Sequence, residues 1–135
     1  MSKVIKNKEY FQQTSFHGEA EPDTPDQKVN DQTILGIDSL TNGIRDDIDI
    51  WINRSALNKE ETLLMRSYAR ELQVVLKNCA LKKTTLPTEQ VELKNAEKKL
   101  LEIGSVVREP TDFTVTRLKL LTCNTEARTK CFDSL

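Results

Sequence analysis

The sequence contains few of the residues that perform chemistry in enzymes. Its 135 residues include one histidine, His17, and three cysteines, Cys79, Cys123 and Cys131, with no CxxC pair. No local motif provides the four Cys or His ligands of a structural zinc site, or the neighbouring base of a Cys–His nucleophile. The four glycines are isolated from one another, which excludes a glycine-rich phosphate loop. We therefore expect a protein that is not an enzyme and that has no cofactor or metal.

The sequence also lacks long hydrophobic runs and an excess of one charge. No apolar stretch approaches the roughly 20 residues of a membrane-spanning helix, and the start of the chain lacks the apolar segment of a signal peptide. A net charge of −1 argues against a surface dedicated to nucleic acid or to anionic membranes. The odd number of cysteines favours reduced thiols. We expect a cytoplasmic protein, with specialised secretion left open, and neither a membrane nor a nucleic acid as its partner.

Turn-forming residues are scarce too, with four glycines and four prolines against 37% apolar and 30% charged residues. Such a composition suits a single helical domain. Three sets of apolar residues recur at intervals of seven, which is two helical turns, so each set lines one side of a helix. These sets are Ile37, Ile44 and Trp51; Met65, Leu72 and Cys79; and Leu93, Leu100 and Val107. The pattern predicts an all-α fold, an antiparallel bundle of about four helices.

The predicted helices span residues 25–53, 57–82, 88–108 and 111–131, and they form a bundle domain over residues 25–135. Their expected N-caps are Thr24, Asn58, Thr88, and Thr111 or Asp112. Gly36 and Gly43 weaken the first helix, so a break near Asn30 or Asn42 stays open. The fourth helix is expected to place Phe113, Leu120, Ala127 and Cys131 on one face, but its start is rich in β-branched residues and could be extended.

A polar arm over residues 1–24 precedes the predicted bundle. It contains Tyr10, Phe11 and Phe16, which are three of the few aromatic residues in the chain. A purely solvated tail rarely holds so many aromatic side chains. We expect the arm either to pack onto the bundle of its own chain or to become ordered on a partner.

The second predicted helix has two apolar stripes. Leu63, Val74 and Leu81 fall together on the side opposite Met65 and Leu72. The basic residues Arg66, Arg70 and Lys77 flank this second stripe. Either the fourth helix or the aromatic arm covers the stripe, or it is an interface with a second copy of the chain or with another protein.

Charge is distributed unevenly between the first two predicted helices. Residues 29–54 have a balance of −3 and residues 55–85 a balance of +3. Antiparallel packing would bring these opposite charges together and help to select the pairing. The cluster of Asp46, Asp47 and Asp49 is expected to face either a basic partner or water.

These observations predict a protein-binding module, such as an adaptor, a chaperone or an inhibitor that occupies another protein's surface. The partner is expected to have an acidic surface that complements the basic residues of the second stripe. The expected contact residues are Leu63, Arg66, Arg70, Val74, Lys77 and Leu81, with Tyr10, Phe11 and Phe16 as a second contact. The main alternative is a secreted effector or an accessory regulator of an effector enzyme. A small nucleic-acid-binding regulator and a Cys-dependent enzyme have less support.

Overall fold

A computed structural model of the protein describes residues 15–16, 19–107, 113–133 and 135. Within these residues the chain forms two short antiparallel strands, β1 (Ser15–Phe16) and β2 (Glu19–Ala20), and several helices joined by loops. The helices of this part of the chain are α2 (Gln27–Asn30), α3 (Asp46–Ser55), α4 (Lys59–Ala80), α5 (Pro87–Val107), α6 (Phe113–Thr122) and α7 (Glu126–Lys130). The expected all-α class is confirmed.

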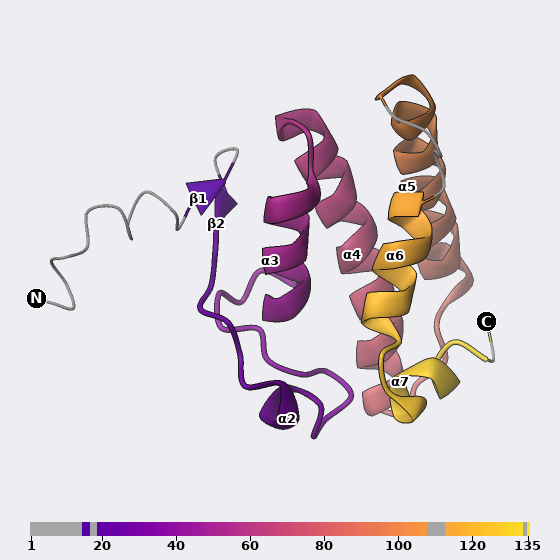
Figure 1. The fold of residues 1–135 in the computed structure, drawn as a ribbon. Coiled ribbons are helices and arrows are strands. Elements are labelled where there is room, and N and C mark those ends of the chain that lie inside the picture. The colour runs from indigo at the N-terminus through magenta and orange to yellow at the C-terminus, as the bar shows by residue number, and fades with distance from the viewer. Residues whose placement is uncertain (1–14, 17–18, 108–112, 134) are drawn as a thin grey trace, which may run out of the picture.

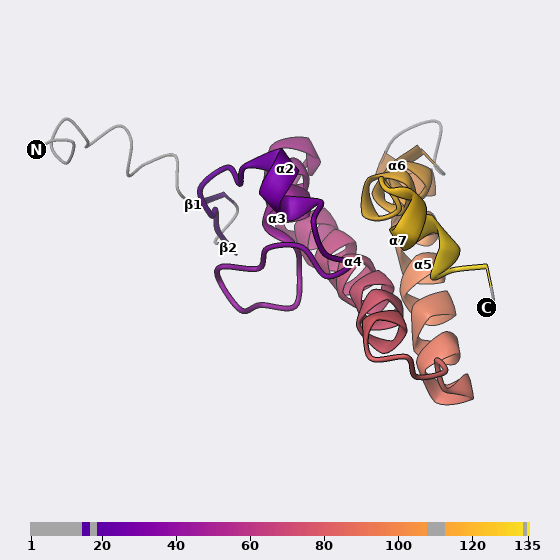
Figure 2. The same cartoon turned by 90° about the horizontal axis from the view of Figure 1, so that it is seen from below.

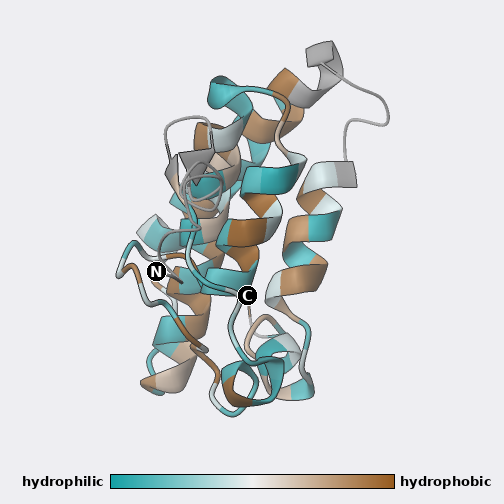
Figure 3. Ribbon diagram, turned by 60° about the vertical axis from the view of Figure 1, so that its left-hand side comes forward, coloured by the Kyte–Doolittle hydropathy of each residue, from teal (hydrophilic) through white to brown (hydrophobic). Residues whose placement is uncertain are grey.

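The longest helix, α4, is the centre of the fold. Helices α3, α5 and α6 each pack against it, and Figure 1 shows α4 with α3 on one side and with α5 and α6 on the other. The buried side chains of α4 include Met65, Tyr68, Ala69 and Leu72. They pack with Ile48 and Ile52 of α3, Leu100 of α5 and Leu118 of α6. Hydrophobic residues recur on these helices among hydrophilic ones (Figure 3), as expected for helices that share a core.

The start of α4 follows from its sequence. The side chain of Asn58 accepts a hydrogen bond from the amide of Glu61 at 2.9 Å and so caps the helix. The Glu61 carboxylate accepts a hydrogen bond from the amide of Leu57, one residue before the cap. The predicted Asn58 cap is confirmed.

The end of α4 requires an unusual backbone conformation. Lys82 has a φ of 58°, the left-handed region that glycine normally occupies after a helix. Its amide donates to the carbonyl of Cys79, and the amide of Lys83 donates to the carbonyl of Asn78. This pair of hydrogen bonds is a Schellman motif with a lysine in the glycine position.

We expect Lys82→Gly to stabilise the protein by about 1 kcal/mol, because an L-residue in the left-handed region is strained and glycine is not. Lys83→Gly removes the same charge at a position where the backbone is not left-handed, so it should bring no stabilisation. Urea denaturation of both variants measures the difference. Equal effects of the two substitutions would show that the backbone of Lys82 is not strained.

The prediction of one continuous helix over residues 25–53 is wrong between residues 31 and 45. A short helix, α2, is capped by Asp26 rather than Thr24, and a loop then runs to the start of α3. The break near Asn30 that the sequence left open is confirmed. Gly36 and Gly43 have φ values of 70° and 82°, which a regular helix cannot accommodate. Ile37 and Ile44 therefore lie in this loop, called loop 31–45, and not on a helical seam.

The third and fourth predicted helices also differ in detail. Helix α5 begins at Pro87, because proline is suited to the first helical position, and Thr88 lies inside the helix instead of capping it. The fourth helix is divided into α6 and α7, and Thr125 caps α7. Residues 111 and 112 lie outside the described residues, while the segment from Phe113 is helical. Six helices in the described residues do not confirm a four-helix antiparallel bundle.

The expected common face of the fourth helix is wrong. Leu120 is 60% exposed, Ala127 is also exposed, and Cys131 follows the end of α7. Instead, the helix contributes Val115 and Leu118 to the core. The division after Thr122 changes the direction of the chain, so residues on the two sides of it no longer share a helical face.

Two buried arginines connect loop 31–45 to the C-terminal helices. Arg128 of α7 is fully buried and donates to the backbone carbonyls of Asn30, Thr33 and Ile34, to the Asp31 carboxylate and to the side chain of Asn124. Arg45, at the other end of the loop, donates to the carbonyls of Leu121 and Thr122 and to the Asp47 carboxylate. Figures 1 and 2 show that α2 and α7 lie at the same end of the molecule.

Gly36 allows these two arginines to approach the loop. A Cβ atom at Gly36 would lie 2.5 Å from Cδ of Arg45 and 2.9 Å from Nη2 of Arg128. Both distances are too short for a real contact, and both side chains are buried. A side chain at position 36 would therefore displace the connection between the loop and α7.

Candidate functional site

The second stripe of α4 is exposed in some places and covered in others. Leu63 and Leu81, near the two ends of the helix, are 48% and 55% exposed. Val74 is half-buried, and Arg70 and Lys77 are exposed. The predicted contact residues of α4 are thus on the surface, with one exception.

The exception is Arg66, which lies inside the protein. Its guanidinium donates to the carboxylate of Asp49 and, at 2.8 Å, to the side chain of Asn53, both on α3. All three residues are buried. The expected position of Arg66 on the rim of a surface patch is corrected: its charge is matched internally and it cannot contact a partner in this structure.

The pairing of Arg66 with Asp49 agrees with the charge pattern of the sequence, since it joins an acidic helix to a basic one. The acids of α3 lie in its first turn, where the helix dipole favours negative charge. Asp46 accepts a hydrogen bond from the amide of Ser39, and Asp47 is paired with Arg45. The expectation that these acids face a basic partner or water is therefore wrong for Asp46 and Asp49, which are buried.

Loop 31–45 covers the next part of the stripe. Nε of Arg70 donates to the carbonyl of Asn42 at 2.9 Å, and Nε2 of Gln73 donates to the carbonyl of Leu35 at 3.0 Å. The sequence predicted cover by the fourth helix or by the aromatic arm, whereas in the described residues it is this loop that makes these contacts. The loop leaves a hollow where it meets α4.

This hollow has a volume of about 370 Å³ and is lined by Gly43, Arg70, Glu71, Gln73, Val74 and Lys77. We call it the α4 groove. Its size is within the range of ligand pockets. A Cβ atom at Gly43 would lie 3.5 Å from Cγ of Arg70, so a side chain at position 43 would take up space in the groove. The groove thus brings together three of the predicted contact residues: Arg70, Val74 and Lys77.

The electrostatics of the α4 groove are asymmetric. Arg70 and Lys77 form no ion pair with any described residue, so both cations are available to solvent or to a ligand. The one acid in the lining is Glu71, whose pKa is raised by burial and by the carboxylates of Glu92 and Glu89 on α5. The groove lining therefore combines the half-buried Val74 with two cations that form no ion pair with a described residue.

The described C-terminal end of the aromatic arm lies against α3, where Arg54 pairs with Glu21 and the side chain of Asn53 donates to the carbonyl of Ala20. Tyr10 and Phe11 lie outside the described residues, as does His17, and Phe16 is described only through its backbone in β1. The second predicted contact therefore stays a prediction. Within the described residues, no group of His, Cys, Asp or Glu side chains could hold a metal ion. No helix in that part of the chain is both long and apolar enough to span a membrane.

The expectation of reduced thiols is wrong for two of the three cysteines. Cys79 and Cys131 form a disulfide with their Cα atoms 5.6 Å apart. Cys123 is free and half-buried, and burial raises the pKa of its thiol. The disulfide removes one of the grounds for a cytoplasmic location, which stays a prediction.

Sequence reasoning missed Arg45, Arg128 and the disulfide. The carbonyl partners of Arg128 are 94 to 98 residues away in the chain, and no local pattern signals such a contact. Comparison of the chain with protein-family models, with curated proteins and with solved structures finds no match.

Proposed function

We propose that the protein is a protein-binding module, of the adaptor, chaperone or inhibitor kind, and that the α4 groove holds an acidic segment of its partner. The observation that supports this proposal is the half-buried Val74 between Arg70 and Lys77, two cations without a carboxylate among the described residues. An apolar anchor surrounded by unmatched charge is typical of surfaces that bind a charged partner.

The spacing of the cations specifies the chemistry of the partner. Arg70 and Lys77 are seven residues apart on α4, which is two turns or about 10 Å along the helix. A partner helix with two acids at the same spacing can face both cations at once. An apolar side chain between those acids would then lie over Val74. Glu71 disfavours additional acids on its side of the groove, which limits the orientations of the partner.

A designed peptide tests this proposal directly. The probe is a fluorescent helical peptide of about 16 residues, with a central leucine and with glutamates three residues before and four residues after it. We expect Val74→Asp to weaken binding of this peptide at least about tenfold, because it places a like charge at the apolar anchor. Fluorescence anisotropy measures the affinity.

Val91→Asp is the matched control. Val91 of α5 is 55% exposed and does not line the α4 groove, so the same substitution there should change affinity by less than about twofold. Val74→Thr keeps the shape of the side chain, and it tests the same position if the aspartate variant does not fold. Equal affinity of wild type, Val74→Asp and Val74→Thr, with all three folded, would refute the proposal.

Charge reversal provides a second test of the same groove. Lys77→Glu should lower the affinity for the glutamate peptide. A peptide with lysine in place of the glutamate that faces position 77 should recover part of the lost affinity. Sedimentation of the free protein distinguishes another occupant. A wild-type dimer that Val74→Asp dissociates would show that the groove binds a second copy of the chain and would exclude the acidic partner.

A further inference from the structure

The Cys79–Cys131 disulfide joins two helix ends that are distant in the sequence. Cys79 is the penultimate residue of α4, and Cys131 directly follows α7. Helix α7 has only five residues, too few to be stable without tertiary contacts. Its position therefore depends on the disulfide, on the packing of Phe132 against the core, and on the hydrogen bonds of Arg128.

Those hydrogen bonds connect α7 to the α4 groove. Arg128 holds the backbone of loop 31–45 through the carbonyls of Thr33 and Ile34. The same loop contacts α4 through Leu35 and Asn42, and it supplies Gly43 to the groove lining. A continuous path of contacts thus runs from the disulfide through α7 and Arg128 to the loop that forms one wall of the groove.

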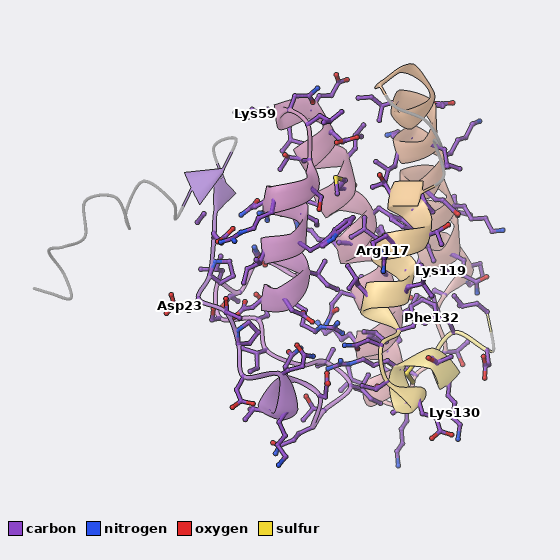
Figure 4. The ribbon with its side chains drawn as sticks, in the orientation of Figure 1. Asp23, Lys59, Arg117, Lys119, Lys130 and Phe132 are labelled. Carbon is purple, nitrogen blue, oxygen red and sulfur yellow. A yellow bond between two sulfur atoms is a disulfide. The ribbon has the colours of Figure 1, made fainter. Side chains whose placement is uncertain are left out.

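The disulfide borders a cavity, although Cys131 itself is buried. Both of its cysteines line a second cavity of about 340 Å³, together with Val75, Lys82, Lys83, Thr84, Thr85 and Lys130. Lys130 lies at the end of the molecule where α7 meets the C-terminal end of α4 (Figure 4). Three lysines line this cavity, of which Lys130 is paired with Glu126, and their positive charge favours the approach of an anionic thiolate, the species that attacks disulfides.

We propose that the Cys79–Cys131 disulfide is a redox switch for the α4 groove, which binds its acidic partner in the oxidised protein and loses affinity when a dithiol reduces the bond. This inference rests on the proposed function of the groove. One thiolate of the dithiol attacks a disulfide sulfur and releases the other cysteine as a thiolate, which takes up a proton. The second thiol of the reductant then displaces the first cysteine. Two electrons and two protons pass to the protein, and the dithiol becomes a disulfide.

Reduction acts on the groove through the position of α7. Without the covalent bond to α4, the short helix no longer holds Arg128 firmly against the carbonyls of loop 31–45. The loop then samples open conformations, and only the fraction of molecules with a formed groove binds the partner. Helix α4 itself is held by α3, α5 and α6 and should not change.

Amide hydrogen exchange tests this coupling without any partner. Treatment of wild-type protein with dithiothreitol should accelerate exchange in loop 31–45 at least about tenfold, for example at the amide of Ile37, which donates to the Asn30 side chain. Exchange at Leu72, in the buried part of α4, should stay unchanged. Unchanged exchange in the loop, or equal acceleration at Leu72, would overturn the proposal.

Affinity for the glutamate peptide tests the consequence for binding. Oxidised wild type should bind at least about tenfold more tightly than protein reduced with dithiothreitol. Cys123→Ser keeps the disulfide and should respond in the same way, while the double variant Cys79→Ser, Cys131→Ser should bind weakly with or without the dithiol.

Two negative results have different meanings. Equal affinity of oxidised and reduced wild type, with Val74→Asp still defective, would overturn the redox switch and leave the proposed function intact. If the oxidised protein does not bind the peptide at all, the proposed function fails and the switch no longer has a target.

Discussion

Replacement of Arg128 by alanine is expected to destabilise the protein by about 3–5 kcal/mol, the range seen when one member of a buried charged network is removed. The substitution leaves the carbonyls of Asn30, Thr33 and Ile34 without their donor. It also leaves the Asp31 carboxylate without its ion pair. The carbonyl of the buried Asn30 is the costliest of these to leave without a partner, because Thr33 is exposed and Ile34 and Asp31 are half-buried.

Urea denaturation followed by circular dichroism measures this effect. Lys130→Ala on the same helix is the control, because the ion pair of Lys130 with Glu126 is exposed to solvent and should contribute less than about 1 kcal/mol. Burial and the nearby guanidinium of Arg45 lower the pKa of Arg128, but an arginine keeps its charge at neutral pH. A loss similar to that of Lys130→Ala would mean that Arg128 does not hold the loop.

Arg66→Ala should have a comparable effect of about 3–5 kcal/mol, because it leaves the buried carboxylate of Asp49 without its guanidinium. Arg70 is the matched control on the same stripe of α4. It is exposed and makes one hydrogen bond to the carbonyl of Asn42, so Arg70→Ala should lower stability by about 1 kcal/mol or less. Two arginines one turn apart are thus expected to differ strongly, one supporting the fold and the other the groove.

The pH dependence of the Arg66→Ala variant provides a further check. Burial raises the pKa of Asp49 above its ordinary value of 3.8, despite the hydrogen bonds from Asn42 and Arg66. Folding therefore favours the protonated acid, and this contribution is complete below 3.8 and is lost as the pH rises through the folded-state pKa. Removing Arg66 should raise the pKa of Asp49 in the folded protein further, because a favourable positive charge is lost. The stability deficit of the variant should consequently be smaller near pH 4 than near pH 7, and a deficit independent of pH would contradict this account.

The central helix of the fold could be predicted because its sequence marks both where the helix starts and which side of it is buried. Asn58 marks the start of α4, and Met65 and Leu72 mark its buried side. Loop 31–45 could not be predicted from periodicity, since Ile44 is buried and keeps the seven-residue interval although it lies in a loop. A buried loop requires apolar residues just as a buried helix does. The positive φ values of Gly36 and Gly43 are what identify this segment as a loop.

The candidate site was predictable in part because most of it lies on the helix α4. An apolar stripe opposite the core side of α4 follows from helical geometry, and it identified Val74 together with the flanking Arg70 and Lys77. Whether a residue beside that stripe is covered depends on segments distant in sequence, so the prediction that Arg66 lies on the surface is wrong. Pairing of cysteines is likewise a long-range property, since Cys79 and Cys131 are separated by 52 residues.

The most direct test of the α4 groove is a titration of ¹⁵N-labelled oxidised protein with the glutamate peptide, followed by NMR. The largest chemical-shift changes should occur at the amides of Gly43, Arg70, Val74 and Lys77, which line the groove. Amides around Val91, on the exposed side of α5, should not shift. Changes concentrated around Val91, or no changes at a saturating peptide concentration, would contradict the assignment of the α4 groove as the binding site.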